Sequence, residues 1–230
     1  KQYNQVLSIS YNNSQISLIK NSFKFYKFYL RKIFICKKMI NKLDDTDFSL
    51  LSIDCLGGII LHDFGLKFNS PTINLWMYPE DFYKYITNIK YYSSLSLKFV
   101  DKKGYDYPVA ILGDIYIYFT HYKSQLEAKQ KWEQRTKRLN YNKILVIVTD
   151  GNNCSIDMLK KFNDLSIPCI AFTHKKIDLN NTFYCKSNFQ GLFNAYVSLF
   201  SLKRYYDDFD FVTWINKSLT ERKNTNNERN

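Results

Sequence analysis

From residue 47 onward, short apolar runs alternate with amphipathic stretches along the chain. Continuous apolar runs are typical of strands that a sheet buries on both faces, and a period of about 3.6 residues is typical of helices. The apolar runs predict strands over residues 48–53, 72–77, 97–100, 109–112, 115–120, 144–148 and 168–172. The segments between and after them predict helices over residues 57–65, 79–91, 124–139, 155–165 and 189–206, with a shorter helix around Trp214. This alternation predicts an α/β fold with a mostly parallel central sheet flanked by helices in Rossmann-like layers.

Local signals support several of these boundaries. Pro79 suits the first position of a helix, because its fixed φ fits there and its missing N–H has no partner to lose. Ser124 and Glu127 have the spacing of a capping box, which predicts a helix start. Gly113 and Asp114 lie between two short apolar runs and predict a hairpin turn.

The segment before residue 44 has a different pattern. Residues 14–43 read as one basic amphipathic helix, because cations recur at helical spacing along one stripe and apolar residues lie opposite. The stripe consists of Lys20, Lys24, Lys27, Arg31, Lys38 and Lys42. Such a helix can lie on an anionic membrane surface, or it can pack on its own domain with a solvated lysine face. The pattern leaves both interpretations open.

The chain therefore divides into three segments. We predict a basic amphipathic N-terminal helix segment over residues 1–43 and a single α/β domain over residues 44–220. Residues 221–230 are polar, and we expect them to form a disordered tail.

The distribution of charge argues against a nucleic-acid partner. A net charge of +12 with 17% aromatic residues would by itself suggest one. Nine of the 33 basic residues, however, lie in residues 1–43, which contain no acidic residue. The rest of the chain is nearly neutral, and it carries no recognised nucleic-acid-binding motif. We therefore expect no nucleic acid to bind.

The cysteines and the hydropathy indicate a cytoplasmic protein. The five cysteines form no CxxC pair, so we expect free thiols in a reducing compartment rather than a zinc site or disulfides. No run of 18 or more apolar residues is present, and lysines interrupt every apolar stretch near the N-terminus. If the basic helix over residues 14–43 binds anionic lipid, this cytoplasmic protein is also peripherally bound to the inner membrane.

Three places in the sequence follow predicted strands, where open α/β sheets bind their ligands. Gly57 and Gly58 come just after Cys55, and adjacent glycines let backbone amides approach a phosphate or simply make a tight turn. Asp150 can bind a ribose hydroxyl or a metal, or it can cap a helix. His121 is the best general acid or base among the histidines, because imidazole titrates near neutral pH and this one closes a strand.

An inward-facing arginine is a further candidate. Arg135 shares a predicted helix face with Trp132 and Leu139, and a buried guanidinium needs a carboxylate or phosphate partner. An internal ion pair is the alternative to a ligand. His62 and His174 have no comparable context in the sequence.

Several familiar motifs of catalysis are missing, and one is present. There is no P-loop, no GxGxxG and no GxSxG, which disfavours kinases, dinucleotide oxidoreductases and α/β-hydrolases. Asp208 and Asp210 form the DxD pattern with which glycosyltransferases hold a divalent ion against a sugar nucleotide. The pair does not follow a clear strand, and aspartate is common at helix starts, so we assign no metal ligands.

A set of short motifs resembles a known family over residues 40–216. They are Cys55-Leu-Gly-Gly58, Ser70-Pro-Thr72, Tyr78-Pro-Glu-Asp-Phe82, Tyr107-Pro108, the block of His121, Tyr122, Lys131, Trp132, Arg135 and Arg138, and Thr149-Asp150 ahead of Cys154. Together they resemble the bacterial family known as domain of unknown function 1919, whose members are often labelled exopolysaccharide or capsular-polysaccharide biosynthesis proteins. The family usually has Asn and Trp around the first cysteine, where this chain has Asp54 and Leu56.

The resemblance implies an α/β fold and a role in the assembly of cell-surface glycans. We predict a transferase of capsule, exopolysaccharide or lipopolysaccharide biosynthesis that moves a glycosyl or related group from an activated donor to a glycan acceptor at the inner membrane surface. The donor would be a sugar nucleotide, and the need for a divalent metal is left open. The alternative is a non-catalytic carbohydrate- or nucleotide-binding accessory protein of a polysaccharide assembly machine.

Under the transferase hypothesis, His121 and Asp150 are the catalytic residues. His121 would deprotonate an acceptor hydroxyl, and Asp150 would bind donor hydroxyls or a metal. The predicted substrate-binding residues are Cys55, Gly57, Gly58, Ser70, Thr72, Tyr122, Trp132, Arg135 and Arg138.

Overall fold

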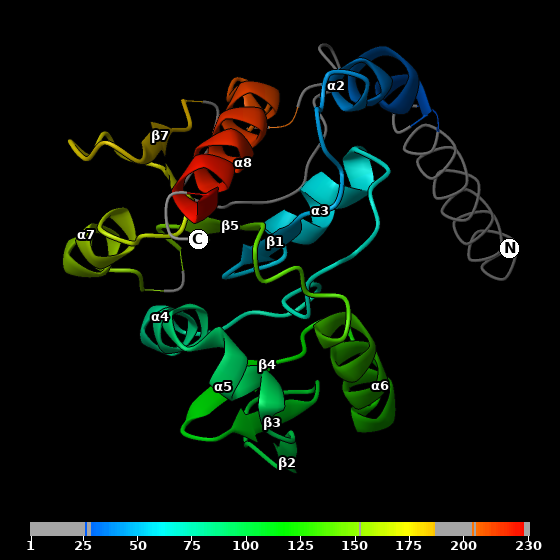
Figure 1. Ribbon diagram of the computed structural model, residues 1–230. Coiled ribbons are helices and arrows are strands. Elements are labelled where there is room, and N and C mark those ends of the chain that lie inside the picture. Colours follow the sequence, from blue (N-terminus) through cyan, green and yellow to red (C-terminus); the bar gives the residue numbers. More distant parts are fainter. Residues whose placement is uncertain (1–25, 27–28, 152, 187–203, 205, 228–230) are drawn as a thin grey trace, which may run out of the picture.

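The computed structural model describes residues 26, 29–151, 153–186, 204 and 206–227, and its centre is a four-stranded parallel sheet (Figure 1). The strand order is β1-β5-β6-β7, with β1 at Ser49–Ser52, β5 at Ile144–Thr149, β6 at Cys169–Thr173 and β7 at Thr182–Tyr184. The mostly parallel central sheet predicted from the sequence is confirmed. Strand β7 has no predicted counterpart, because it is short and half-exposed at the sheet edge and so lacks an apolar run.

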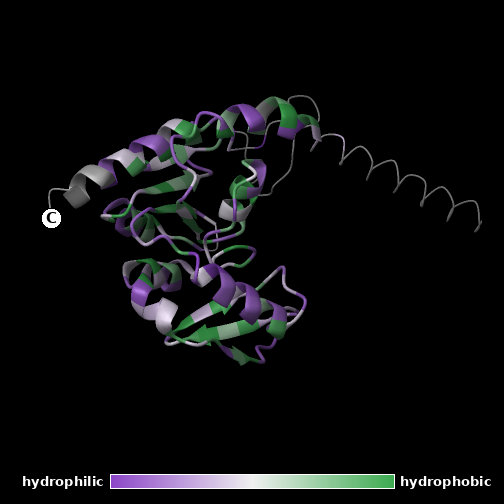
Figure 2. Ribbon diagram, turned by 45° about the vertical axis from the view of Figure 1, so that its right-hand side comes forward, coloured by the Kyte–Doolittle hydropathy of each residue, from purple (hydrophilic) through white to green (hydrophobic). Residues whose placement is uncertain are grey.

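Helices cover both faces of the parallel sheet. Helices α3 (Leu56–Asp63) and α8 (Phe211–Asn227) pack with Leu50, Leu145 and Ile147 on one face. Helices α4 (Pro79–Thr87) and α7 (Ile156–Asn163) pack with Leu51 and Val146 on the other. Figure 2 shows the strands largely in green between helices of mixed colour. Burial on both faces explains why β5 and β6 read as nearly continuous apolar runs, whereas β1 buries two serines beside its two leucines.

A second, antiparallel sheet lies beside the first in the lower part of Figure 1. Its order is β2-β3-β4, with β2 at Lys98–Val100, β3 at Val109–Leu112 and β4 at Ile115–Tyr118. The predicted hairpin is confirmed, and Gly113 takes a φ of 65° in its turn, a value that glycine adopts without strain. Helix α6 (Gln125–Thr136) follows, and the Ser124 hydroxyl accepts a hydrogen bond from the Glu127 amide at 3.2 Å, as the capping box predicted.

The segment over residues 72–77 is not the strand that the apolar run predicted. Asn74 takes a φ of 63°, which breaks the extended conformation. Only Trp76 pairs like a strand residue, through hydrogen bonds of 3.0 Å in both directions with the Tyr118 backbone. The next amide, that of Met77, donates to the Ile53 carbonyl at 3.1 Å. This buried segment therefore connects the ends of the two sheets.

Two predicted helices have different bounds in the structure. The helix predicted over residues 79–91 divides at Asn88, whose φ of −126° separates α4 from α5 (Ile89–Ser94). Helix α8 continues to Asn227, well into the segment that we expected to be a disordered tail. Arg222 explains part of this difference, because its guanidinium donates to the Ile144 carbonyl at 2.8 Å and attaches the helix to β5. The helix predicted over 189–206 lies almost entirely outside the described residues.

The N-terminal segment is joined to the domain by buried charges. Its described part comprises a π-helical turn, η1 (Lys32–Cys36), and α2 (Lys37–Ile40); Lys20, Lys24 and Lys27 lie outside the described residues. Arg31, which the stripe placed toward solvent, is only 1% exposed. Its guanidinium pairs with Asp63 at 2.8 Å and with Asp207. The exposed position predicted for Arg31 is therefore wrong, because two long-range carboxylates neutralise it inside the protein.

Asp63 is the centre of this network. Its carboxylate also accepts hydrogen bonds from Arg204 at 2.8 Å and from the Tyr206 hydroxyl at 3.0 Å. Burial alone would raise the pKa of Asp63, but the hydrogen bonds and charges of Arg204 and Arg31 lower it overall. The network joins the N-terminal segment, α3 and the segment before α8.

Among the residues that the structure describes, no helix is long and apolar enough to cross a membrane.

Candidate functional site

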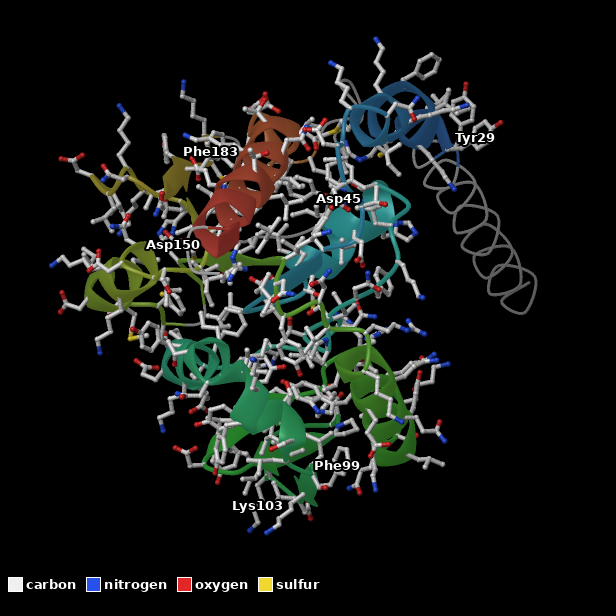
Figure 3. All side chains as sticks on the ribbon, in the orientation of Figure 1. Tyr29, Asp45, Phe99, Lys103, Asp150 and Phe183 are labelled. Atoms are coloured by element: carbon white, nitrogen blue, oxygen red, sulfur yellow. The ribbon has the colours of Figure 1, made fainter. Side chains whose placement is uncertain are left out.

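Three polar side chains follow the parallel strands at their carboxyl ends. Asp54 follows β1, Asp150 follows β5 and His174 follows β6. Because β1, β5 and β6 are parallel neighbours, these ends meet at one edge of the sheet, where ligands of open α/β sheets bind. Asp150 is labelled in Figure 3.

Asp150 and His174 form a close pair at this edge. The Nδ1 atom of His174 lies 2.6 Å from Asp150 Oδ2, and the same oxygen accepts the His174 backbone amide at 2.9 Å. The Asp150 amide in turn donates to the Phe172 carbonyl at 3.1 Å, which extends the ladder between β5 and β6. The backbone of both strands therefore fixes the pair.

The two members of the pair differ in exposure, which suggests their roles. The Asp150 side chain is 6% exposed, whereas the His174 ring is 35% exposed. With Nδ1 directed at the carboxylate, Nε2 is the ring nitrogen left for a substrate. A buried carboxylate that orients a partly exposed imidazole is the arrangement of a general base.

The other carboxylate oxygen of Asp150 has a different environment. Oδ1 is buried and has no hydrogen-bond partner among the described residues. Buried carboxylate oxygens are usually hydrogen-bonded, because an unpaired one loses the stabilisation it had in water. Oδ1 is therefore suited to accept a hydrogen bond from a hydroxyl group at the site.

Asp54 ties the end of β1 to the end of β5. Its carboxylate accepts hydrogen bonds from the Thr149 hydroxyl at 2.8 Å, the Leu56 amide at 2.9 Å and the Ser52 hydroxyl at 3.3 Å. Burial raises the pKa of Asp54 above its usual value, although these three donors lower it in part. Asp54 thus holds the strand ends and the start of α3 in place beside Asp150.

The cysteines around this edge are not activated nucleophiles. Burial raises the pKa of Cys55 to about 12, and the neighbouring Asp54 carboxylate adds to the effect. Burial, together with the Asp150 charge, likewise raises the pKa values of Cys154 and Cys185 to about 12. These thiols are therefore protonated at neutral pH, and a protonated thiol is a poor nucleophile.

His121 does not join this group in the structure. It lies exposed after β4, and its backbone amide donates to the Asn74 carbonyl at 3.4 Å. None of the hydrogen bonds or ion pairs described for residues 29–151 and 153–186 joins its ring to Asp150 or His174. The predicted catalytic role of His121 stays a prediction, whereas the geometry brings His174 to Asp150.

Gly57 and Gly58 lie inside the first turn of α3 rather than in a turn before it. A Cβ atom at Gly57 would come within 2.7 Å of the Ser52 Cβ, and one at Gly58 within 3.0 Å of Ile73 Cγ2. The Leu56 amide at the start of this helix already donates to Asp54. These contacts give the glycines a packing role, since glycine lets α3 approach β1 at Gly57 and the segment of Ile73 at Gly58.

Arg135 is buried, as the sequence predicted, but its hydrogen-bond partners are neutral. Its guanidinium donates to the Tyr122 hydroxyl at 2.5 Å and to the Ile73 carbonyl at 3.2 Å, and it lies 5.3 Å from the centre of the Phe68 ring. Arg138 donates to the Phe68 carbonyl at 3.5 Å. No ion pair joins Arg135 to a carboxylate within the part of the chain that is described. The two arginines hold α6 against the loop that precedes residue 74.

The remaining predicted binding residues stabilise the same loop or the core. The Thr72 hydroxyl accepts a hydrogen bond from the Ser52 amide at 3.0 Å and lies 3.0 Å from the Ser70 hydroxyl. Ser70 and Thr72 are both fully buried. Trp132 packs in the core against Phe119. The structure thus gathers Ser70, Thr72, Tyr122 and Arg135 around one loop, and none of the hydrogen bonds described for these four residues reaches Asp150 or His174.

The DxD pattern acts as a helix cap. Asp210 accepts the Thr213 amide at 3.0 Å and its hydroxyl at 2.7 Å at the start of α8, and these hydrogen bonds lower its pKa. Within the described ranges, no group of three or more His, Cys, Asp or Glu side chains is placed to hold a metal ion.

His174 is the candidate site residue that the sequence analysis did not select. It directly follows the apolar run of β6, so the rule that nominated Asp150 after β5 also applies to it. The sequence could not show that the β5 and β6 ends are adjacent, which is what makes the two residues a pair.

Comparison with known proteins shows a family and a relative to which this chain is similar. The family model described as "Domain of unknown function (DUF1919)" matches residues 25–216. A Haemophilus influenzae protein that carries the name "Uncharacterized protein" is 34% identical over 192 residues, which covers 81% of this chain and 92% of that protein.

Proposed function

The chain belongs to the family described as domain of unknown function (DUF1919), and we propose that it is a transferase that moves a glycosyl or related group from an activated sugar donor to a glycan acceptor. The observation that carries this proposal is the pair of Asp150 and His174 at the carboxyl ends of β5 and β6. The setting in bacterial cell-surface polysaccharide assembly rests on the resemblance of the sequence motifs.

His174 acts as the base in the proposed reaction. Its Nε2 atom takes the proton of an acceptor hydroxyl while that oxygen bonds to the anomeric carbon of the donor. The bond from this carbon to the donor's phosphate oxygen breaks, and the nucleoside diphosphate leaves with the bonding electrons. The buried Asp150 carboxylate stabilises the imidazolium that forms, and its free Oδ1 accepts a hydrogen bond from a sugar hydroxyl.

A donor screen tests this function. Nucleoside-diphosphate sugars are added singly, with and without Mg²⁺ or Mn²⁺, and the melting temperature is measured. One donor should raise it, because a ligand at a hundred times its Kd stabilises the native state by about 2.7 kcal/mol. That donor should then release nucleoside diphosphate in the presence of glycan acceptors. Binding without release would instead support a non-catalytic accessory protein, and a lack of response to every donor would contradict the transferase.

Membrane docking of the N-terminal segment is a second part of the proposal. Large apolar side chains on this segment are exposed: Tyr26, Tyr29, Ile33 and Phe34. Exposed lysines accompany them: Lys32, Lys37 and Lys38. An apolar face with lysines on the same helical segment matches the chemistry of an anionic lipid surface, and inner-leaflet binding would bring the enzyme to a lipid-linked acceptor.

Vesicle co-sedimentation tests the docking. The full chain should sediment with vesicles that contain about one third phosphatidylglycerol and stay in solution with phosphatidylcholine alone. The double variant Ile33→Ser/Phe34→Ser should lose most of this binding, whereas Leu126→Ser, an exposed apolar residue on α6, should keep it. Point variants are preferable to a truncation, which would also remove Arg31 from its buried network. Equal sedimentation of the two variants would refute membrane docking through this segment.

A further inference from the structure

The outer face of the antiparallel sheet carries a cluster of aromatic rings. Along β4, Ile115 and Ile117 point into the core, so Tyr116 and Tyr118 lie on the opposite face. Rings from the neighbouring segments gather over this face and form, with the two tyrosines, what we call the aromatic patch: Trp76, Tyr78, Tyr105, Tyr107, Tyr116 and Tyr118.

The patch is held together by direct ring contacts. Trp76 stacks on Tyr118 with ring centres 4.0 Å apart and planes 10° apart. Tyr105 lies 5.0 Å and Tyr78 5.6 Å from the same Tyr118 ring, and the Trp76 indole donates to the Tyr107 hydroxyl at 3.3 Å. Tyr118 is fully buried and forms the base, while the other rings are partly exposed, Tyr116 by 36%. The accessible rings are therefore preorganised for a ligand.

A single ammonium group lies among these rings. Lys102 Nζ is 4.1 Å from the centre of the Tyr116 ring and donates to the Tyr118 hydroxyl at 2.6 Å. The hydrogen bond to Tyr118 raises the pKa of Lys102, so the group is charged at neutral pH. Other lysines of the chain, such as Lys84 and Lys143, pair with carboxylates, but no ion pair is described for Lys102 within residues 29–151.

This combination fits the chemistry of an acidic sugar chain. The C–H faces of pyranose rings pack on aromatic rings, and tyrosine hydroxyls and an indole N–H exchange hydrogen bonds with sugar hydroxyls. An ammonium without a carboxylate partner complements the carboxylate of an acidic sugar. A single-stranded nucleic acid would also stack on rings, but it requires a groove with cations that follow its backbone, whereas the cation contacts described for these rings all come from Lys102.

The patch is also connected to the candidate site. The two neighbours of Trp76 in the chain contact the end of β1. The Leu75 carbonyl lies 4.0 Å from the Cys55 sulfur, and the Met77 amide donates a hydrogen bond to the Ile53 carbonyl. The segment that presents Trp76 is therefore in contact with the end of β1, next to Asp54.

We propose that the aromatic patch is the acceptor-binding surface and that it takes an oligosaccharide containing carboxylate-bearing sugars, with a carboxylate paired to Lys102. This proposal rests on the transferase function proposed above and names the class of its acceptor.

Binding to defined oligosaccharides tests the patch. The probe is an oligogalacturonate, compared with its methyl ester, which keeps the sugar backbone and removes the charge; affinity is measured by calorimetry and by tryptophan fluorescence. The full chain should bind the acid form at least tenfold more tightly than the ester. Lys102→Met should remove this preference without weakening ester binding, and Tyr116→Ala, which removes an accessible ring, should weaken both by about tenfold.

Two controls separate the patch from the catalytic site. Tyr91→Ala removes an exposed ring elsewhere on the chain and should bind both probes normally. His174→Ala should also bind both probes normally while losing group transfer, because His174 belongs to the candidate site and not to the patch. If the unaltered chain binds the acid probe but transfers no group, that result contradicts the transferase function and leaves the patch proposal standing. The patch proposal is refuted if neither probe binds, if acid and ester bind equally, or if Lys102→Met and Tyr116→Ala behave like Tyr91→Ala.

Discussion

Replacing Asp63 with alanine is expected to lower the free energy of unfolding by about 3–5 kcal/mol, because removing one member of a buried ion-pair network leaves its partners charged inside the protein. The Asp63 side chain is 6% exposed and binds Arg31, Arg204 and the Tyr206 hydroxyl. Urea denaturation monitored by tryptophan fluorescence measures the change. Loss of the carboxylate should also loosen the N-terminal segment, since Arg31 attaches it to α3.

An exposed ion pair provides the matched control. Asp157 pairs with Lys160 at 3.1 Å on the surface of α7, and exposed pairs contribute at most about 1 kcal/mol. Asp157→Ala should therefore change the free energy of unfolding by less than about 1 kcal/mol. Equal effects of Asp63→Ala and Asp157→Ala would show that the buried network does not stabilise the fold.

The dependence on pH gives an independent check of the same network. The pKa of Asp63 is lower in the folded protein than in the unfolded chain, where it is about 3.9. Its contribution is thus fully present above the unfolded pKa and is lost as the pH falls through the folded pKa. The difference in stability between the original chain and Asp63→Ala should accordingly shrink in acid below about pH 4.

Replacing His174 with alanine is expected to lower kcat by about 10²–10⁴-fold, the range that a positioned general base contributes. Asp150→Asn should have a comparable effect, because the amide can turn its NH₂ group toward Nδ1 and stabilise the wrong tautomer. Transfer from the donor found in the screen measures both. Because the His174 ring is partly exposed, the thermal stability of His174→Ala should stay close to that of the original chain.

The other histidines serve as controls for this assignment. His62 is 73% exposed on α3 and away from the strand ends, so His62→Ala should retain full activity. His121→Ala separates the base favoured by the sequence from the one favoured by the geometry. If His121→Ala lost transfer and His174→Ala kept it, the base would be His121, and the pair with Asp150 would have another role.

The elements that the sequence predicted well are those whose signals are local. The strands β5 and β6 are apolar runs because helices cover both of their faces, and the start of α6 follows from the hydrogen bond between Ser124 and Glu127. The strand predicted over residues 72–77 failed although its pattern is equally apolar. Its burial comes from lying between two sheets, and the left-handed Asn74 prevents a continuous ladder.

Within the candidate site, the sequence alone could nominate Asp150 but not its partner. A residue at the end of an apolar run is visible in the sequence, whereas the neighbour of that strand is decided by sheet order. Strand β6 lies next to β5, and this places His174 on a carboxylate 24 residues earlier in the chain. The aromatic patch is likewise not visible in the sequence, because its rings come from β4 and from two other segments that only the fold brings together.

By itself, the sequence determined the α/β class, most element positions and the helix caps, because these depend on side chains within a few residues of one another. The tertiary structure alone decided how the buried charges are paired and which groups lie together at the candidate site. Arg31 reads as part of a solvated stripe until Asp63 and Asp207, 32 and 176 residues away, neutralise it in the interior. The physical reason is that the state of an ionisable group depends on its burial and on nearby charges, and folding supplies both from distant parts of the chain.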